Sequence, residues 1–132
     1  MEEYQYQITQ DSATGAVIVP WNSTGTTASV TRTGLTLTNG TRYYFSVKAR
    51  NGAGSWSFAG NSDGITVDST VPATPVVTDD GAYTSSTTQL HATWTSTDAE
   101  SGIAEYQYAI GTTAGGTDLV NWTSTGSTAS VT

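Results

Sequence analysis

The chain has 132 residues, a formal net charge of −7 and only four basic side chains. So few cations exclude a nucleic-acid-binding protein, since binding to a phosphate backbone depends on clustered Lys and Arg. The absence of cysteine excludes a disulfide framework and thiolate zinc sites. No run of about 18 apolar residues occurs, so insertion into a membrane is not expected.

The remaining composition predicts an all-β protein. Glycine accounts for 14 residues and charged residues for only 11 %, while Thr, Val, Tyr and Trp recur between short Gly or Asn turns. β-Branched and aromatic residues of this kind favour strands. By its length the chain is one domain or parts of two.

Two stretches of the sequence occur twice. Residues 4–8 (YQYQI) return as residues 106–110 (YQYAI), 102 positions later. Residues 21–31 return as residues 122–132, 101 positions later, and share Trp-x-Ser-Thr-Gly and Ala-Ser-Val-Thr. These matches define an internal repeat with a period of about one hundred residues. Because the chain is little longer than one period, we expect it to begin and to end inside repeats.

In chain order, the first predicted strand covers residues 3–9. Tyr4, Tyr6 and Ile8 alternate there with polar residues, which is the period of two that a half-buried strand shows. Further strands of the first half are expected at residues 16–21, 26–31, 43–50, 55–59 and 63–67. Pro20 favours an edge position for its strand, because proline cannot donate a hydrogen bond to a neighbouring strand.

Residues 43–50 have the clearest alternation of the whole chain. One face would carry Tyr43, Phe45, Val47 and Ala49, and the other Arg42, Tyr44, Ser46, Lys48 and Arg50. The pair Asn39-Gly40 before this segment marks a tight turn. The apolar face therefore predicts a strand that borders the core.

A boundary is predicted after the first half. Pro72 and Pro75 favour an extended connection over a central strand, so we expect residues 68–72 to be a linker between repeats. Beyond it we expect a short edge strand from residue 76, a strand at 90–94 with Leu90, Ala92 and Trp94 facing inward, and the second copy of the first strand at 104–110.

With these elements placed, the sequence resembles a fibronectin type III domain, an immunoglobulin-like β-sandwich of seven strands in two antiparallel sheets. Trp94 matches the family's tryptophan on strand B, and Tyr106 and Tyr108 match its apolar positions on strand C. The signature around strands E and F is matched by Leu37, Asn39, Gly40, Thr41, Tyr43, Phe45, Val47, Ala49, Asn51 and Gly54. The resemblance implies that the Tyr43 hydroxyl bonds back to the corner before its strand. Asn39 departs from the family, which more often has proline there.

The resemblance covers the chain in permuted order. Residues 1–67 are similar to strands C to G of one repeat, and residues 73–132 to strands A to the start of E of the next. Each half alone would leave an apolar sheet face and unpaired edges in water. We therefore expect head-to-tail completion between chains; the alternative is a circularly permuted single domain within one chain.

Catalysis has little support in the sequence. Nucleophilic catalysis needs a base within hydrogen-bond reach of the nucleophile, and the only histidine, His91, falls on the outward face of its predicted strand. We expect no enzyme activity and no cofactor.

Two groups of side chains are candidates for binding. Asp79, Asp80, Asp98 and Glu100 are weak candidates for calcium, which prefers carboxylate and carbonyl oxygens, but solvated turns are the favoured account of these acids. Arg42, Tyr44, Lys48 and Arg50 are candidates for an anion- or glycan-binding face. The alternative for this second group is a charge ladder across the sheet against Glu3, Gln5 and Gln7.

The Thr-rich, cysteine-free style is similar to that of tandem modules in large bacterial exported proteins. The resemblance implies a non-catalytic structural spacer or interaction module of an extracellular or cell-surface tandem-repeat protein. One alternative is an accessory module of a secreted enzyme or adhesin that binds carbohydrate or protein. Another is a filament subunit that exchanges strands with its neighbours. The partners would be neighbouring repeats or further copies of the chain, with self-association by completion of half-domains.

Overall fold

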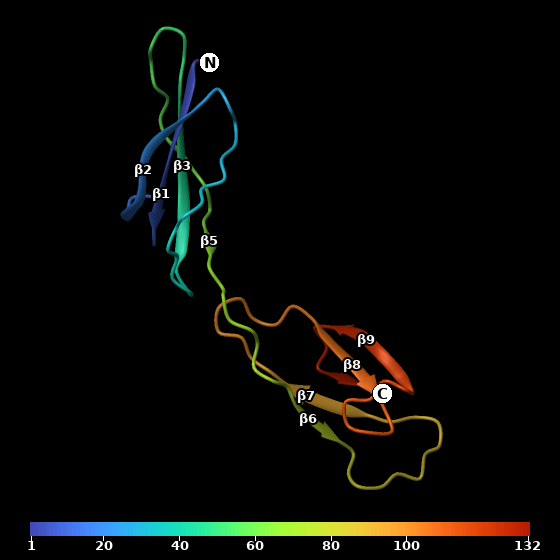
Figure 1. The fold of residues 1–132 in the computed structure, drawn as a ribbon. Helices are drawn as coiled ribbons and strands as arrows, with labels where there is room; N and C mark the ends of the chain where they lie inside the picture. Colours follow the sequence, from blue (N-terminus) through green and yellow to red (C-terminus); the bar gives the residue numbers. More distant parts are fainter. The chain divides into compact units, whose positions relative to one another are not determined.

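A computed structural model describes residues 1–132, and all of its regular structure is β-strand (Figure 1). The strands are β1 (Glu3–Gln10), β2 (Ala16–Gly25), β3 (Arg42–Arg50), β4 (Gly60–Asn61), β5 (Ile65–Thr66), β6 (Val76–Asp79), β7 (Ala92–Thr95), β8 (Tyr106–Ile110), β9 (Val120–Gly126) and β10 (Ser130–Val131). All pairings between them are antiparallel. The chain is thus all-β, with several antiparallel sheets as in a β-sandwich, and it has no helix that could span a bilayer.

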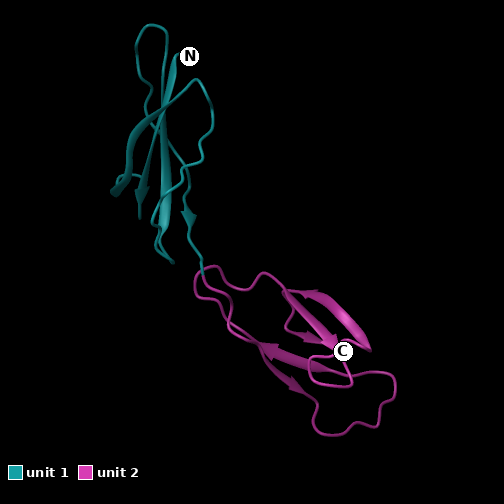
Figure 2. Cartoon of the chain, viewed as in Figure 1, with its two compact units in different colours: residues 1–69 teal, residues 70–132 magenta.

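The chain forms two compact units, residues 1–69 and residues 70–132 (Figure 2). Their boundary lies inside the segment 68–72 that the prolines suggested as a linker. We call them unit 1 and unit 2 and describe each by itself.

Unit 1 is built on a sheet with the strand order β2-β1-β3-β4, in which β5 also pairs with β3. The central strand is β1, where Ile8 lies opposite Val19 on one neighbour and Phe45 on the other. Pro20 belongs to β2, which is an edge strand. Proline is tolerated there because an edge strand has a side that pairs with no neighbour and needs no N–H donor.

The core of unit 1 gathers on one face of this sheet. Tyr6, Ile8, Val19 and Tyr43 are buried there, as the alternation of β1 and β3 predicts. The backbone N–H of Thr38 donates to the Tyr43 hydroxyl at 2.9 Å, which is the bond back to the preceding corner that the resemblance implied. Partly buried apolar side chains surround this cluster: Ile18, Leu35, Phe45 and Val67.

Unit 2 contains two separate small sheets, one with the order β10-β7-β6 and one formed by β8 and β9. Trp94 of β7 is only 7 % exposed. Its ring lies 5.9 Å from the Tyr106 ring and 6.5 Å from the Tyr108 ring, centroid to centroid. These aromatic contacts, at the distances typical of favourable ring pairs, connect the two sheets.

Some predicted strands differ from the structure. Residues 26–31 were expected to form a strand, but β2 ends at Gly25 and no strand follows before β3. The equivalent residues of the second copy do form a strand, β10, because β7 lies beside them and pairs with them. Residues 55–59 make only an isolated bridge, from Trp56 to Arg50. A strand needs a neighbour, and in unit 1 neither segment has a full one.

Candidate functional site

The outer face of β3 carries the predicted cationic residues. Lys48 and Arg50 lie two residues apart, so a strand directs both side chains to the same face. The Lys48 ammonium lies 4.5 Å from the centre of the Trp21 ring and 4.9 Å from that of Trp56. The Arg50 guanidinium lies 5.7 Å from the Trp56 ring. Contacts of this kind are attractive cation–π interactions.

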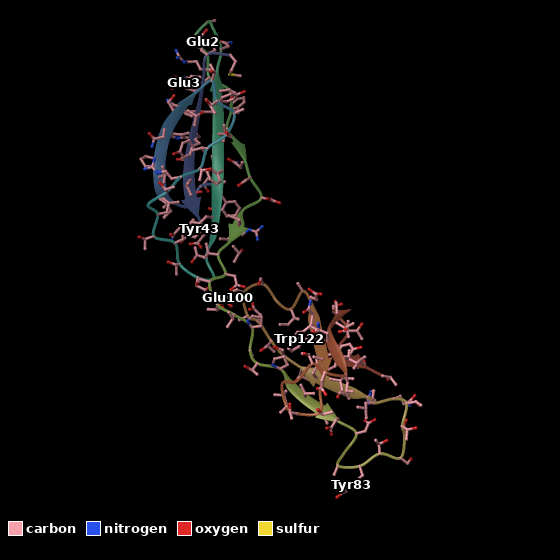
Figure 3. All side chains as sticks on the ribbon, turned by 45° about the vertical axis from the view of Figure 1, so that its right-hand side comes forward. Glu2, Glu3, Tyr43, Tyr83, Glu100 and Trp122 are labelled. Carbon is pink, nitrogen blue, oxygen red and sulfur yellow. The ribbon has the colours of Figure 1, made fainter.

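An ion pair continues this row of side chains. Arg50 Nη2 lies 3.1 Å from Glu3 Oε1, across the pairing of β1 with β3. Figure 3 shows Glu3 at the start of β1. We call Trp21, Lys48, Trp56, Arg50 and Glu3 the cation–aromatic ladder. A charge ladder across the sheet was the alternative considered from the sequence. The structure adds two tryptophans to it, Trp21 and Trp56, which the sequence pattern did not connect with these charges.

Arg42 and Tyr44 lie further along the same face of β3. The Arg42 Nε and Nη2 atoms donate to the Asp63 carbonyl at 3.1 and 2.6 Å, and the guanidinium lies 5.9 Å from the Tyr44 ring centre. Gly64 is required beneath them: it has φ +89°, and a Cβ there would lie 2.6 Å from Arg42 Nε. The four residues predicted as a ligand face therefore share one face of β3, and all three of their charges already have partners within unit 1.

Hydrogen bonds and charge lower the pKa of Glu3. The largest contribution to the lower pKa is a hydrogen bond with the Ser23 side chain. Desolvation opposes it, while the hydrogen bond of Gln5 and the charge of Arg50 lower the pKa further. The ionised carboxylate is thus favoured in the folded chain. Unfolding exposes a carboxyl group with the ordinary pKa of 4.5, so the stabilisation is complete above that value and is lost as the pH falls through the lower folded pKa.

We expect the Glu3→Gln variant to differ from the parent chain only where Glu3 is ionised. Between about pH 6 and about pH 3, the parent should lose more of its free energy of unfolding than the variant does. Urea titrations at several pH values measure this difference. Glu2→Gln, a change of the exposed neighbour, is the control, and a parallel pH dependence of parent and Glu3→Gln chains would contradict the prediction.

The structure keeps the two pairs of calcium candidates apart. Asp79 lies opposite Ala92 and Val76 opposite Thr95, so Asp79 and Asp80 are at one end of the β6–β7 pair. Asp98 and Glu100 follow the other end, beyond Thr95. The sequence had suggested that the two pairs meet at one end of a sandwich, and this is not the arrangement found.

Each of these acids engages local groups. Asp79 Oδ1 accepts the Gly81 N–H at 3.1 Å, and Asp98 Oδ1 accepts the N–H of Ser101 at 2.9 Å. Such bonds are typical of carboxylates that stabilise turns. Glu100 Oε2 accepts the Thr70 hydroxyl at 3.2 Å. Calcium binding by these residues remains a prediction.

His91 has a partner that sequence reasoning missed. Its Nδ1 lies 2.8 Å from Asp80 Oδ1, with 38 % of the histidine side chain and 66 % of the aspartate exposed. The antiparallel register that puts Asp79 opposite Ala92 also puts Asp80 opposite His91. Only the pairing of the two strands, which the sequence pattern does not give, could have identified this partner. A carboxylate can orient an imidazole for general base catalysis. In this open setting the contact is an exposed hydrogen bond between the two side chains.

An apolar groove lies on the inner face of unit 1. It has a volume of about 160 Å³ and is lined by Tyr4, Tyr6 and Val47 on one side and by residues 27–30 on the other. Val47 faces it while remaining 40 % exposed. Sequence reasoning expected an uncovered apolar face in this half, because residues 1–67 lack counterparts of the strands that precede Tyr106 in the second copy.

Comparison of the chain with models of protein families, with curated proteins and with solved structures gave no match.

Proposed function

We propose that the chain is a non-catalytic structural module, a fibronectin type III-like seven-stranded β-sandwich repeat of an extracellular tandem-repeat protein. In this role it separates and connects neighbouring repeats. The observation that carries the proposal is that the duplicated sequence forms the same hairpin twice. The acidic, cysteine-free, Thr-rich composition supports an exported repeat, and it is the basis for the extracellular location.

The two hairpins agree in register, including their irregularities. In β1–β2, Tyr4 lies opposite Gly25, Tyr6 opposite Asn22 and Ile8 opposite Val19. In β8–β9, the pairs are Tyr106 with Gly126, Tyr108 with Thr123 and Ile110 with Val120. Both hairpins shift register after the first tyrosine and between the second tyrosine and the isoleucine, and β1–β2 has a third shift after Ile8. A slip of one residue in the register would move every side chain of a strand to the opposite face of the sheet. The agreement in register therefore supports one shared fold.

The turns that follow the hairpins agree as well. The N–H of Gly25 donates to Ser23 Oγ at 3.0 Å, and the N–H of Gly126 donates to Ser124 Oγ at the same distance. The two glycines have φ +62° and +61°, a conformation that suits glycine. Two separated segments with the same turn chemistry support a repeated module rather than a chance similarity of two strands.

The exposure of the tryptophan in unit 2 follows from the absence of a neighbouring strand. Trp122 is 62 % exposed (Figure 3), whereas its counterpart Trp21 is half-buried under Lys48 of β3. In unit 2, β8 pairs only with β9, so no counterpart of β3 lies beside this hairpin. The exposure of Trp122 thus needs no sugar ligand, which favours the structural role over a carbohydrate-binding one.

The proposal predicts that one full repeat folds alone. We expect a rearranged chain, in which residues 70–103 precede residues 2–69, to be monomeric and to unfold in one cooperative transition. Its melting temperature should exceed that of the present chain, because β7 and β3 would then cover the same hairpin from both sides. Calorimetry with sedimentation velocity measures both properties. The same rearranged chain with Trp94→Ala is the control, and a rearranged chain without a cooperative transition would refute the proposed repeat.

A further inference from the structure

The second copy of the repeat shows what covers the tyrosine pair. In unit 2, Trp94 of β7 lies against Tyr106 and Tyr108, and β7 pairs with β10. The backbone N–H of Trp94 also donates to the Ala129 carbonyl at 3.1 Å. These residues correspond in unit 1 to Tyr4, Tyr6 and the segment 28–31. No strand of unit 1 pairs with that segment, and the apolar groove lies between it and the two tyrosines.

The groove has room for an aromatic ring. Its volume of about 160 Å³ is comparable to an apolar cavity of roughly 150 Å³ that binds benzene. Its walls include Tyr4, Tyr6 and Ala28, the counterparts of three residues that contact Trp94, together with Val47 of β3. Apolar groups exposed in such a groove gain stability when another chain covers them.

We propose that the groove of unit 1 binds the β6–β7 hairpin of a second copy of this chain, with Trp94 inserted beside Tyr4 and Tyr6. The register follows from unit 2, where Thr93 lies opposite Ser130 and Ala92 opposite Val131. In the complex Thr93 would lie opposite Ser29 and Ala92 opposite Val30. This inference rests on the proposed function, because it takes the two copies to be equivalent repeats.

The linker between unit 1 and the β6–β7 hairpin is too short for the hairpin to fill the groove of its own chain in this register. Ser69 is held beside the start of β3, since its N–H donates to Asn39 Oδ1 at 2.7 Å. Ala73 is held beside the end of β7, since its N–H donates to the Thr97 carbonyl at 2.9 Å. Four residue steps separate Ser69 from Ala73 and reach at most about 14 Å.

The distance that the linker would have to cover is longer than its reach. In the proposed register the end of β7 extends past Trp94 toward Tyr4, which lies opposite Ala49 near the far end of β3. From Arg42 to Ala49 the strand rises by about 23 Å, at about 3.3 Å per residue. A hairpin that fills the groove must therefore come from another molecule, and the contact is head-to-tail. Such heterologous contacts continue into rings or open filaments.

Unit 1 is also the more complete of the two acceptors for the hairpin. Its central strand β1 is paired on both edges, by β2 and by β3, while β8 is paired only with β9. Val47 of β3 adds an apolar wall for which β8–β9 has no counterpart within the chain. Exchange of the hairpin would release β8, β9 and β10 of the donor chain and cover an apolar face that includes Val47 as well as the tyrosine pair.

Engineered cysteines in the full chain test this contact, because the chain has no cysteine of its own. Directly opposed strand residues have Cα atoms about 4.5–5.5 Å apart, within the range for a disulfide. We expect a mixture of Ser29→Cys and Thr93→Cys chains to form, under oxidised glutathione, a covalent dimer with one chain of each kind. The control is a mixture of Ser29→Cys with Thr87→Cys, a position on the exposed loop between β6 and β7. The yield of covalent dimer from the first mixture should be at least about fivefold higher than that from the control.

Equal yields for the two mixtures would overturn the proposal, as would a sharp monomer mass for the parent chain at every concentration. Either result leaves the repeat itself intact if the rearranged chain still folds cooperatively. If the rearranged chain fails to fold while the cysteines link specifically, the contact between copies stands and the proposed repeat does not. The two experiments therefore separate the partner from the module.

Discussion

Replacement of Trp94 by alanine is expected to lower the free energy of unfolding of unit 2 by about 3–5 kcal/mol, the range for removal of a buried tryptophan. Trp94 connects the two sheets of this unit through Tyr106 and Tyr108. Without it, few buried apolar side chains hold β6–β7 against β8–β9. Hydrogen exchange at the backbone amides of positions 94 and 108, compared between parent and variant, measures the loss of stability within this unit.

Two other substitutions calibrate this result. Trp122→Ala removes the same side chain at an exposed position and should change stability by no more than about 0.5 kcal/mol. Trp94→Phe keeps an aromatic ring and loses an indole Nε1 that is buried without a hydrogen-bond partner, so it should lose less than the alanine variant. Equal losses for Trp94→Ala and Trp122→Ala would contradict the role given to Trp94.

The same substitution bears on self-association. If Trp94 is the anchor of the contact between copies, Trp94→Ala should shift the sedimentation profile to the monomer, whereas Trp122→Ala should leave it unchanged. Anchors of this kind, large aromatic side chains in a fitted pocket, dominate the energy of many interfaces. Persistent association of the Trp94→Ala chain would place the contact elsewhere.

Several features were predictable because they depend on local alternation. Tyr4, Tyr6 and Ile8 alternate with polar residues, and β1 forms over nearly the expected range. Residues 42–50 likewise form β3 with Tyr43 in the core. In both strands the pattern of side chains indicates which face carries the core cluster. It does not give the burial of every position, since Val47 of the apolar face is 40 % exposed and Ser46 of the polar face is buried.

Other features depend on neighbours that a pattern does not identify. Residues 28–31 and 129–132 both read Ala-Ser-Val-Thr, yet only the second copy forms a strand, because only there does β7 lie alongside. The contact of Lys48 with Trp21 and Trp56 required the pairing of β1 with both β2 and β3. Identical sequence with different structure shows that strand formation here is decided by tertiary pairing.

The departure at Asn39 has a structural role of its own. Where the resembled family more often has proline, the Asn39 side chain accepts the N–H of Ser69 at 2.7 Å and its hydroxyl at 3.2 Å. Proline has no side-chain acceptor for these bonds. Asn39 thus fixes the end of unit 1 at the corner before β3, and this attachment is what shortens the reach of the following hairpin.

A second large effect is expected from Ile8→Ala, which should lower the free energy of unfolding of unit 1 by about 2–5 kcal/mol. Ile8 is 3 % exposed, at the centre of a strand that is paired on both sides. Its counterpart Ile110 is half-buried on a strand with one neighbour. Since less apolar area is removed from water there, Ile110→Ala should cost only about 1 kcal/mol.

The two isoleucine variants form a matched pair because the repeat places the same residue in the same hairpin register. The two units need not unfold together, so the loss is best measured within each one. Amide hydrogen exchange of β1 and of β8 gives separate values. Equal losses would contradict the argument, since they would require that β8–β9 be covered as fully as β1–β2. A loss at Ile110 that grows with protein concentration would instead require that another chain supply the cover that β3 gives to Ile8.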